Sequence, residues 1–348
     1  MRSDRLIALT LPCLALFFCI SCGDGKPNPE MEAQHQSRTG GLNSKVDPIQ
    51  NFLNMIRAYN DSNLEDLLDA YSIDTFWQAP CAQRPPVRGN KIVVRQIVAF
   101  KVKLPESSIT VRRIFGKGDM VVAQVVMNAV QRWDAQGIQK QKPVEMGCEM
   151  LYVVEADANG KLKATLLYVD PSTTQKQLGL VYGEAPPVPA KPKGEPEKVT
   201  GPAEAGIEDL AGKVFDLWGK SDYDEFEKMT ASGFRYRDMR YGTSWDFARL
   251  KADDVEKKSV MSERIFKVEQ VIAAGSYALV RYTMEAKYAV GSGVDKKIVP
   301  IAIHGADVLE FRDGKLAQME AYRSEMELNA QISDVETTGP DASVSPNK

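Results

Sequence analysis

The chain carries the same series of motifs twice, first over about residues 48–180 and again over about residues 207–331. The stretch Ala58 to Leu64 returns as Leu217 to Tyr223, at an offset of 159 residues (217 − 58). Later motifs return at offsets of 157 (275 − 118) and 154 (313 − 159) residues, so spacing persists although identity has mostly gone. A series repeated at nearly constant spacing is typical of one structural unit used twice. We therefore expect two domains of the same architecture.

Each repeat is predicted to begin with three helices and a short strand. Apolar residues recur at helical spacing over 47–58 and 91–102 in the first repeat and over 207–217 and 244–258 in the second. Between these stretches, Ser62 with Glu65 and Ser221 with Asp224 match the capping box, in which side chains satisfy the free amides of a first helical turn. The short strand is expected at residues 75–79 and 234–238.

Long strands follow the helices in both repeats. Val144 to Val154 and Val280 to Tyr288 alternate apolar with polar residues, which is the period of a strand with one apolar face. A last strand is predicted after a glycine turn, over residues 162–170 and 316–323. Because long strands that are apolar on one face need a covering layer, we expect the helices of the same repeat to cover them.

The first residues of the chain indicate export. A charged stretch ends at Arg5 and an apolar run then extends to Ile20. This run is shorter than the roughly 20 residues that a membrane-spanning helix needs, so it is typical of a secretory signal. Its end resembles the bacterial lipobox, which implies cleavage before Cys22, lipidation of that cysteine and stable attachment to a membrane. Gly23 favours the outer membrane of the cell envelope, and an ordinary cleaved signal is the alternative.

Polar and proline-rich segments divide the rest of the chain. After the signal at 1–21, a flexible tether is expected at 22–44, and a disordered tail at 334–348. Residues 183–206 contain six prolines and favour an extended, semi-rigid spacer. The two folded domains are therefore expected at 45–182 and 207–333.

Charge and cysteine content exclude several classes of function. A formal net charge of -3 without a basic run gives no electrostatic footprint for nucleic acid. Of five cysteines, only Cys81 and Cys148 lie beyond the signal and the lipidation site. An exported location permits a disulfide between them, and two unpaired buried thiols are the alternative. The sequence contains no metal-ligand spacing and no phosphate-binding or dinucleotide motif, so we expect no metal and no cofactor.

Three helices followed by long strands, with a glycine turn before the last one, resemble the nuclear transport factor 2-like superfamily. The first repeat is closer still, because Tyr168 to Pro171 and Gln177 to Leu180 look like the closing segment of SnoaL-like polyketide cyclases. The resemblance implies an α+β fold in which a curved antiparallel sheet wraps around N-terminal helices and forms a cone with a pocket. It thus implies two tandem cone-shaped domains.

Asp170 is the first candidate for catalysis. It is in phase with Tyr168, so its carboxylate would end inside the first cone if that face lines the pocket. In cyclases of the resembled family a pocket aspartate is the acid or base, and an apolar pocket raises the pKa of a carboxyl group. Trp77, Trp133 and Tyr168 are expected to bind ligand in the wall. Alternatively, Asp170 caps the helix that begins near Pro171.

His304 is the second candidate. An offset of 158 residues, set by a glycine that both repeats share, matches it to Met146 and places it inside the second cone. Together with Glu320 and Tyr322, which share a parity on the last strand, it would form a proton-transfer site, and Tyr322 would also contact ligand. A lone histidine on an apolar strand face is alternatively a hydrogen-bonded core residue.

The sequence favours a noncatalytic role. It lacks a complete acid/base constellation and a nucleophile elbow. We expect a lipid-anchored module of the cell envelope that binds a small apolar ligand or an envelope protein. The alternative is a cofactor-independent lyase or isomerase that uses Asp170, or His304 with Glu320, because fold alone does not decide function. The sequence does not decide whether the sheets pair within one chain or between two copies.

Overall fold

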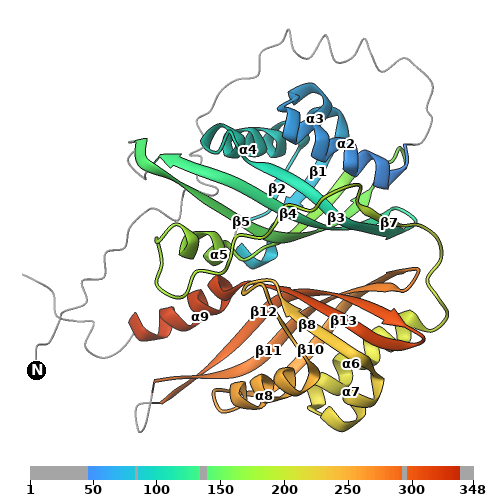
Figure 1. Cartoon of the computed structure of the whole chain (residues 1–348), viewed down its shortest axis with the longest axis vertical. Helices are drawn as coiled ribbons and strands as arrows, with labels where there is room; N and C mark the ends of the chain where they lie inside the picture. The colour runs from blue at the N-terminus through green and yellow to red at the C-terminus, as the bar shows by residue number, and fades with distance from the viewer. Residues whose placement is uncertain (1–45, 83–84, 134–138, 292–295, 338–348) are drawn as a thin grey trace, which may run out of the picture.

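The computed structural model describes residues 46–82, 85–133, 139–291 and 296–337. Each repeat forms one sheet with its three N-terminal helices on one face, and the two sheets pack back to back (Figure 1). The layers therefore run helices, sheet, sheet, helices. The predicted α+β class is confirmed, but each sheet is mixed rather than purely antiparallel. Strand β1 (Tyr71–Gln78) runs parallel to β6 (Leu162–Tyr168), and β8 (Thr230–Asp238) runs parallel to β13 (Lys315–Arg323).

The first repeat places three helices before its long strands. The helices are α2 (Pro48–Asp61), α3 (Leu64–Ala70) and α4 (Asn90–Lys103), and a short helix, α5 (Pro171–Gln177), follows the sheet. The strands are β1 (Tyr71–Gln78), β2 (Val87–Arg88), β3 (Ser108–Lys117), β4 (Met120–Trp133), β5 (Gln139–Ala156) and β6 (Leu162–Tyr168), with a 3-10 turn, η2 (Pro80–Ala82), between β1 and β2. Their order in the sheet is β2-β1-β6-β5-β4-β3-β7.

The second repeat has the same order of elements. Its helices are α6 (Ile207–Lys220), α7 (Tyr223–Met229) and α8 (Phe247–Lys257), and α9 (Glu325–Thr337) follows the sheet. The strands are β8 (Thr230–Asp238), β9 (Thr243–Trp245), β10 (Met261–Ala274), β11 (Tyr277–Val290), β12 (Lys297–Arg312) and β13 (Lys315–Arg323). Their order is β10-β11-β12-β13-β8-β9. The third helix begins at Phe247 rather than Ser244, which lies in β9.

The junction between the first two helices is built alike in both repeats. Ser62 and Ser221 adopt the left-handed conformation, each with φ of 58°, and end α2 and α6. Asn63 and Asp222 then cap α3 and α7, and each side chain accepts a hydrogen bond from an amide three residues later. The predicted capping boxes were therefore wrong by one residue, because the serine serves as the C-cap of the preceding helix.

The proline-rich segment does not hold the domains apart. Its strand β7 (Glu197–Val199) pairs in parallel with β3 at the edge of the first sheet. The Glu197 carboxylate accepts a hydrogen bond from Arg113 Nε at 2.7 Å and another from the Tyr277 hydroxyl at 2.8 Å. The expected spacer is therefore partly folded between the two domains. Composition could not indicate this, because both partners of Glu197 lie outside the segment.

Apolar residues are buried in three places. One cluster lies between helices and sheet in each domain. The third lies between the two sheets and includes Phe115, Leu151 and Tyr168 from the first and Tyr277, Val308 and Tyr322 from the second. Each sheet is thus covered on both faces, whereas we expected cover from the helices alone. In the described ranges, no helix has the length and apolar character that crossing a membrane would need.

Candidate functional site

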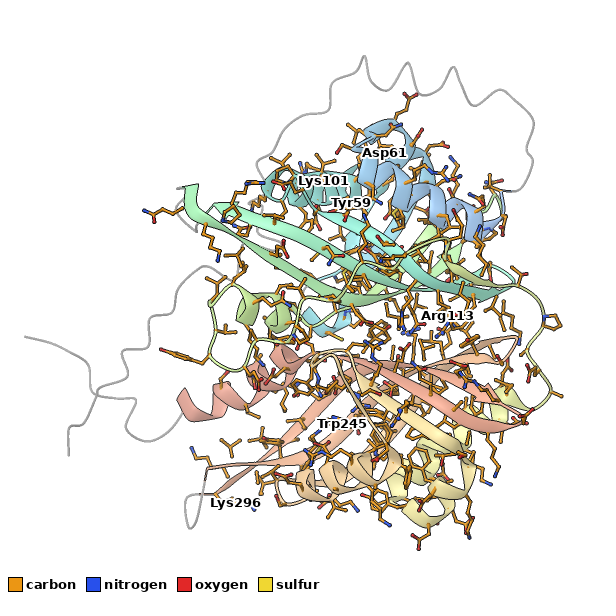
Figure 2. All side chains as sticks on the ribbon, in the orientation of Figure 1. Tyr59, Asp61, Lys101, Arg113, Trp245 and Lys296 are labelled. Atoms are coloured by element: carbon orange, nitrogen blue, oxygen red, sulfur yellow. The ribbon has the colours of Figure 1, made fainter. Side chains whose placement is uncertain are left out.

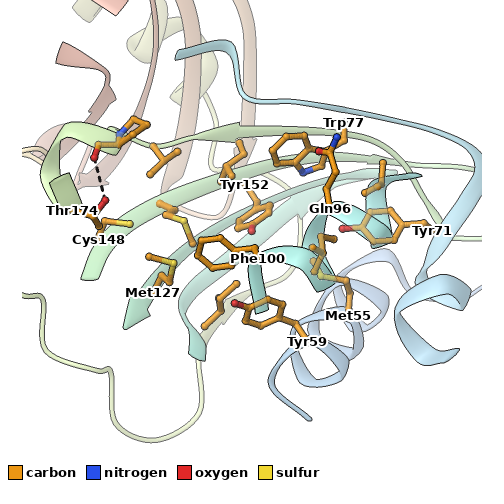
Figure 3. A pocket seen from close by; sticks show the side chains of 17 residues that line it. Met55, Tyr59, Tyr71, Trp77, Gln96, Phe100, Met127, Cys148, Tyr152 and Thr174 are labelled. Carbon is orange, nitrogen blue, oxygen red and sulfur yellow. Dashed lines mark hydrogen bonds between the residues drawn. The ribbon is translucent and has the colours of Figure 1, made fainter. Parts of the chain in front are cut away.

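The first domain encloses a cavity of about 90 Å³ between its helices and its sheet (Figure 3). Aromatic and sulfur-containing side chains dominate the wall, among them Tyr59, Tyr71, Trp77, Phe100, Met127 and Tyr152. Helix α4 supplies one side, the long strands supply the opposite side, and α5 closes one end with Pro171 and Thr174. A concave, mostly apolar space with a few polar groups is the usual form of a small-molecule site.

Three tyrosine hydroxyls lie in the cavity wall, and two of them have no hydrogen-bond partner among the described residues. The Tyr59 hydroxyl is hydrogen-bonded to the Ser107 hydroxyl at 2.6 Å. No described residue forms a hydrogen bond with the hydroxyl of Tyr71 or of Tyr152, although these residues are only 2% and 8% exposed. Buried hydroxyls normally have a partner. A ligand or water in the cavity would therefore supply the hydrogen-bond partner that the described residues do not.

Burial keeps the titratable groups of the wall neutral. It raises the pKa of Tyr59 and the pKa of Cys148 to about 12, and it raises the pKa values of Tyr71 and Tyr152 as well. The described wall contains no carboxylate, imidazole, ammonium or guanidinium group. The cavity can thus bind a neutral molecule and hydrogen-bond to it, but its described groups do not exchange a proton near neutral pH.

Aromatic side chains fill the corresponding space in the second domain. The Phe215 ring lies 4.9 Å from that of Tyr282, and the Trp218 ring lies 5.1 Å from that of Phe266, measured between centroids. The Arg323 guanidinium lies 4.9 Å from the Trp218 ring and donates to the Tyr282 hydroxyl at 2.7 Å. In the described ranges, this side chain and its aromatic neighbours pack closely together in the interior of the second domain.

The filled interior also holds a buried carboxylate that sequence reasoning did not single out. Asp307 accepts hydrogen bonds from the Tyr282 hydroxyl at 2.9 Å and from Arg323 at 3.1 Å. Burial raises the pKa of Asp307 to about 6, although the Arg323 charge acts in the opposite direction. Both partners of Asp307 are side chains of its own domain, so it completes the packing of this interior.

Asp170 caps α5 and does not line the cavity. Its carboxylate accepts hydrogen bonds from the Ser172 amide at 3.2 Å and the Ser172 hydroxyl at 2.7 Å. The hydroxyl of Ser324, in the second domain, donates to it at 3.2 Å. Burial raises the pKa of Asp170, but the group borders a gap of only about 10 Å³ between the domains. The cap interpretation is confirmed by this geometry.

The prediction that the Tyr168 face of β6 lines the cavity was wrong. Leu167 and Val169 face the cavity, whereas Tyr168 belongs to the cluster between the sheets. There its hydroxyl accepts a hydrogen bond from Arg281 Nε at 3.0 Å. Since both faces of β6 are buried, apolar alternation did not distinguish the inner face from the outer one.

His304 pairs with α9 and not with Glu320. Its Nδ1 lies 2.5 Å from Oε1 of Glu327, and its backbone amide donates to Oε2 of the same carboxylate at 3.0 Å. The hydrogen bond to Glu327 raises the pKa of His304, and its side chain is 44% exposed. The histidine therefore anchors a helix, on a strand face directed away from the second interior.

Glu320 and Tyr322 lie close together, but between the two sheets. The Glu320 carboxylate receives two hydrogen bonds of 2.8 Å from Arg112 and one of 3.1 Å from Arg237. Gln124 donates to the Tyr322 hydroxyl at 3.0 Å. Burial opposes ionisation, yet the arginine charges and the hydrogen bonds hold the pKa of Glu320 below its usual value. Figure 2 shows the neighbouring Arg113 in the same layer between the domains.

The remaining predicted residues fall into three groups. Trp77 lies in the cavity wall. The side chain of Trp133 and all of Cys22 lie outside the described residues. Cys81 and Cys148 are both free buried thiols, the first between the sheets and the second in the cavity.

Sequence reasoning missed most of the cavity wall. Tyr59 and Tyr71 lie outside the predicted helix 47–58 and strand 75–79, and neither was assigned to a pocket. Phe100 and Gln96 occupy the inner face of α4, where the helical period was a usable signal. In the described ranges, no group of three or more histidine, cysteine or acidic residues is arranged to hold a metal ion.

The second domain matches a known family. Residues 211–319 match the family model of the SnoaL-like domain, so a SnoaL-like domain lies there. In the sequence itself the first repeat carried the closer motifs. No curated protein matches the chain.

Several solved structures are similar to part of the chain. A protein of Shewanella denitrificans OS-217, described as a SnoaL-like polyketide cyclase, has 17% identity and a TM-score of 0.34, covering 38% of this chain and 99% of that one. A protein of the same description from Shewanella putrefaciens CN-32 has 15% identity and a TM-score of 0.34, with coverages of 38% and 98%. IdmH of Streptomyces antibioticus, described as a polyketide cyclase, has 21% identity and a TM-score of 0.34, with coverages of 38% and 99%.

Proposed function

We propose that this protein is a noncatalytic, lipid-anchored module of the cell envelope whose first domain binds a small, neutral, mostly apolar ligand. The observation that carries the proposal is the contrast between the two interiors. The first holds a cavity of about 90 Å³, and aromatic rings with Arg323 fill the second. On this proposal the second domain supports the first and does not bind a ligand itself.

The supporting role of the second domain follows from its contacts with α5. Pro171 and Thr174 of this helix line the cavity. Lys176, on the same helix, forms an ion pair of 2.6 Å with Glu325 at the start of α9. Glu325 also accepts from the Ser172 hydroxyl at 3.3 Å. The second domain therefore fixes one wall of the cavity in place.

The lyase or isomerase alternative requires an acid or base in contact with the ligand. Asp170 faces the gap between the domains, His304 pairs with Glu327, and Glu320 is held by arginines. None of these three residues lines the cavity. The geometry thus favours binding over proton transfer.

Binding of benzene, a neutral apolar probe, tests the proposal by isothermal titration calorimetry. We expect the wild-type protein to bind benzene and Met127→Trp to lose binding, because the larger side chain occupies the cavity that Met127 lines. Ile265→Trp, which adds the same ring on a side chain that is 55% exposed, is the matched control and should bind like wild type. Absence of binding by wild type, or equal binding by Met127→Trp, would contradict the proposed function.

The membrane anchor is tested separately. We expect Cys22→Ser to move from the membrane fraction to the soluble fraction after cell breakage and a high-salt wash, because no acyl chain is then attached and salt weakens attachment by charge. Mass spectrometry of the wild-type N-terminal peptide should show the acyl groups on Cys22. An unmodified Cys22 in membrane-extracted protein would overturn the lipid anchor but would leave the ligand site untouched.

A further inference from the structure

Helix α4 carries exposed apolar side chains among the basic residues of its outer face. Its inner face contributes Val93, Gln96 and Phe100 to the cavity. Its outer face exposes Val102 to 73% and Ile92 to 46%. Apolar and basic side chains therefore lie side by side on the exposed face of this helix.

Further exposed apolar side chains surround α4. Ile73 on β1 is 83% exposed and Leu64 on α3 is 48% exposed. Both elements pack directly against α4 (Figure 1). Single exposed apolar residues are ordinary, but a group of them on adjoining elements is typical of an interaction surface.

The charge of α4 is one-sided. Its 14 residues include four basic residues and no acidic one: Lys91, Arg95, Lys101 and Lys103. The equivalent helix of the second domain, α8, balances three basic residues against three acidic ones: Arg249, Lys251, Lys257, Asp253, Asp254 and Glu256. The repeat thus provides an internal comparison, in which only the helix over the cavity is basic.

Two of these basic side chains are available to an outside partner. Lys101 is engaged with the Ser107 carbonyl and the Tyr59 ring. Arg95 and Lys103 are exposed and form no ion pair with any described residue. Acidic residues on α3 bound this surface on one side, and one of them, Asp69, pairs with Lys161. The positive surface is therefore a strip along α4.

We propose that the outer face of α4 docks on the surface of an anionic phospholipid membrane. Basic residues are attracted to anionic headgroups, and the apolar side chains between them enter the boundary between headgroups and acyl chains. An anchor at Cys22 permits this contact, because the 23 residues from 23 to 45 span at most about 80 Å. The role of this docking rests on the proposed function. Docking would place the cavity wall against the bilayer, so that a membrane-soluble ligand reaches the cavity without crossing bulk water.

Vesicle co-sedimentation tests the docking without the lipid anchor. Residues 23–348 are suitable, because every described element lies between residues 46 and 337. We expect binding to vesicles of phosphatidylglycerol and phosphatidylcholine, weaker binding at high salt, and little binding to phosphatidylcholine alone. Each basic residue near such a surface contributes about fivefold in affinity, so Arg95→Gln with Lys103→Gln should weaken binding about 25-fold.

Matched variants decide the outcome. Arg249→Gln with Lys257→Gln removes the same charge from α8 and should leave vesicle binding unchanged, while Val102→Ser should weaken it. Failure of the wild-type chain to prefer anionic vesicles, or an equal loss in the α4 and α8 variants, would overturn the docking surface. The cavity takes no part in this measurement. Vesicle binding without probe binding would contradict only the proposed function. Probe binding without vesicle binding would contradict only the docking.

Discussion

At the scale of single residues, buried polar groups hold the two domains in one arrangement. Asp170 is the clearest case, because it caps α5 through Ser172 and also receives a hydrogen bond from Ser324 of the other domain. We expect Asp170→Ala to lower the free energy of unfolding by about 1–2 kcal/mol, the usual cost of losing a helix cap. Chemical denaturation would measure the loss. Probe binding abolished at unchanged stability would instead indicate a direct role of the carboxylate in the site.

His304 should make stability depend on pH. Its pKa is raised above the ordinary value of 6.5 chiefly by the hydrogen bond to Glu327. A raised pKa in the folded state means that the stability from this pair is fully present below about pH 6.5 and is lost as pH rises through the raised value. The difference in Tm between wild type and His304→Gln should therefore shrink with increasing pH. A difference that is constant from about pH 5 to 9 would contradict the charged pair.

At the scale of elements, strand register explains where the sequence prediction failed. Thr283, which corresponds to Val126 at the offset of 157, pairs with His304, whereas Val126 itself pairs with Glu149. His304 therefore corresponds to Glu149, at an offset of 155 (304 − 149), and not to Met146. The three-residue difference is odd, so it moves the side chain to the opposite face of the sheet.

Periodicity predicted the order and type of the helices and long strands, because burial of one face imposes it locally. It could not predict which face of β6 or β12 lines an interior. That choice depends on the second sheet, which buries the outer face of the first. Among the predicted wall residues whose side chains the structure describes, Trp77 is the one that lies in the cavity. The positions of the tyrosine hydroxyls depend on the assembled fold.

Strand β12 approaches the second interior so closely that it requires a glycine. A Cβ added at Gly305 would lie 2.4 Å from the Tyr282 hydroxyl. We expect Gly305→Ala to destabilise the protein by about 1–3 kcal/mol, as overpacking of a filled core does. Gly212→Ala in α6, where an added Cβ meets nothing within 4 Å, is the control and should be neutral or slightly stabilising. Equal thermal stability of the two variants would show that the second interior can hold the added methyl group without strain.

At the scale of the whole molecule, a buried network of arginines and glutamates joins the sheets. The Glu320 side chain is 1% exposed and meets Arg112 of the first domain and Arg237 of its own. Removing one partner of a buried ion pair leaves the other charges buried and unpaired. Glu320→Gln should therefore lower the free energy of unfolding by about 3–5 kcal/mol. Because the pKa of Glu320 is below the usual 4.5, its contribution is present above about pH 4.5 and is lost as pH falls through the lowered value. Denaturation of both proteins over this pH range would check both expectations, and a Glu320→Gln variant as stable as wild type would contradict them.

The central claim is that two copies of one fold have divided their roles, with a ligand cavity in the first domain and a filled support in the second. A crystal structure of residues 23–348 grown with benzene tests this division of roles. We expect density for the probe inside the first domain, in contact with Tyr71, Trp77 and Tyr152, and unchanged packing around Trp218. Density within the second domain, or an empty first cavity at a saturating probe concentration, would contradict it.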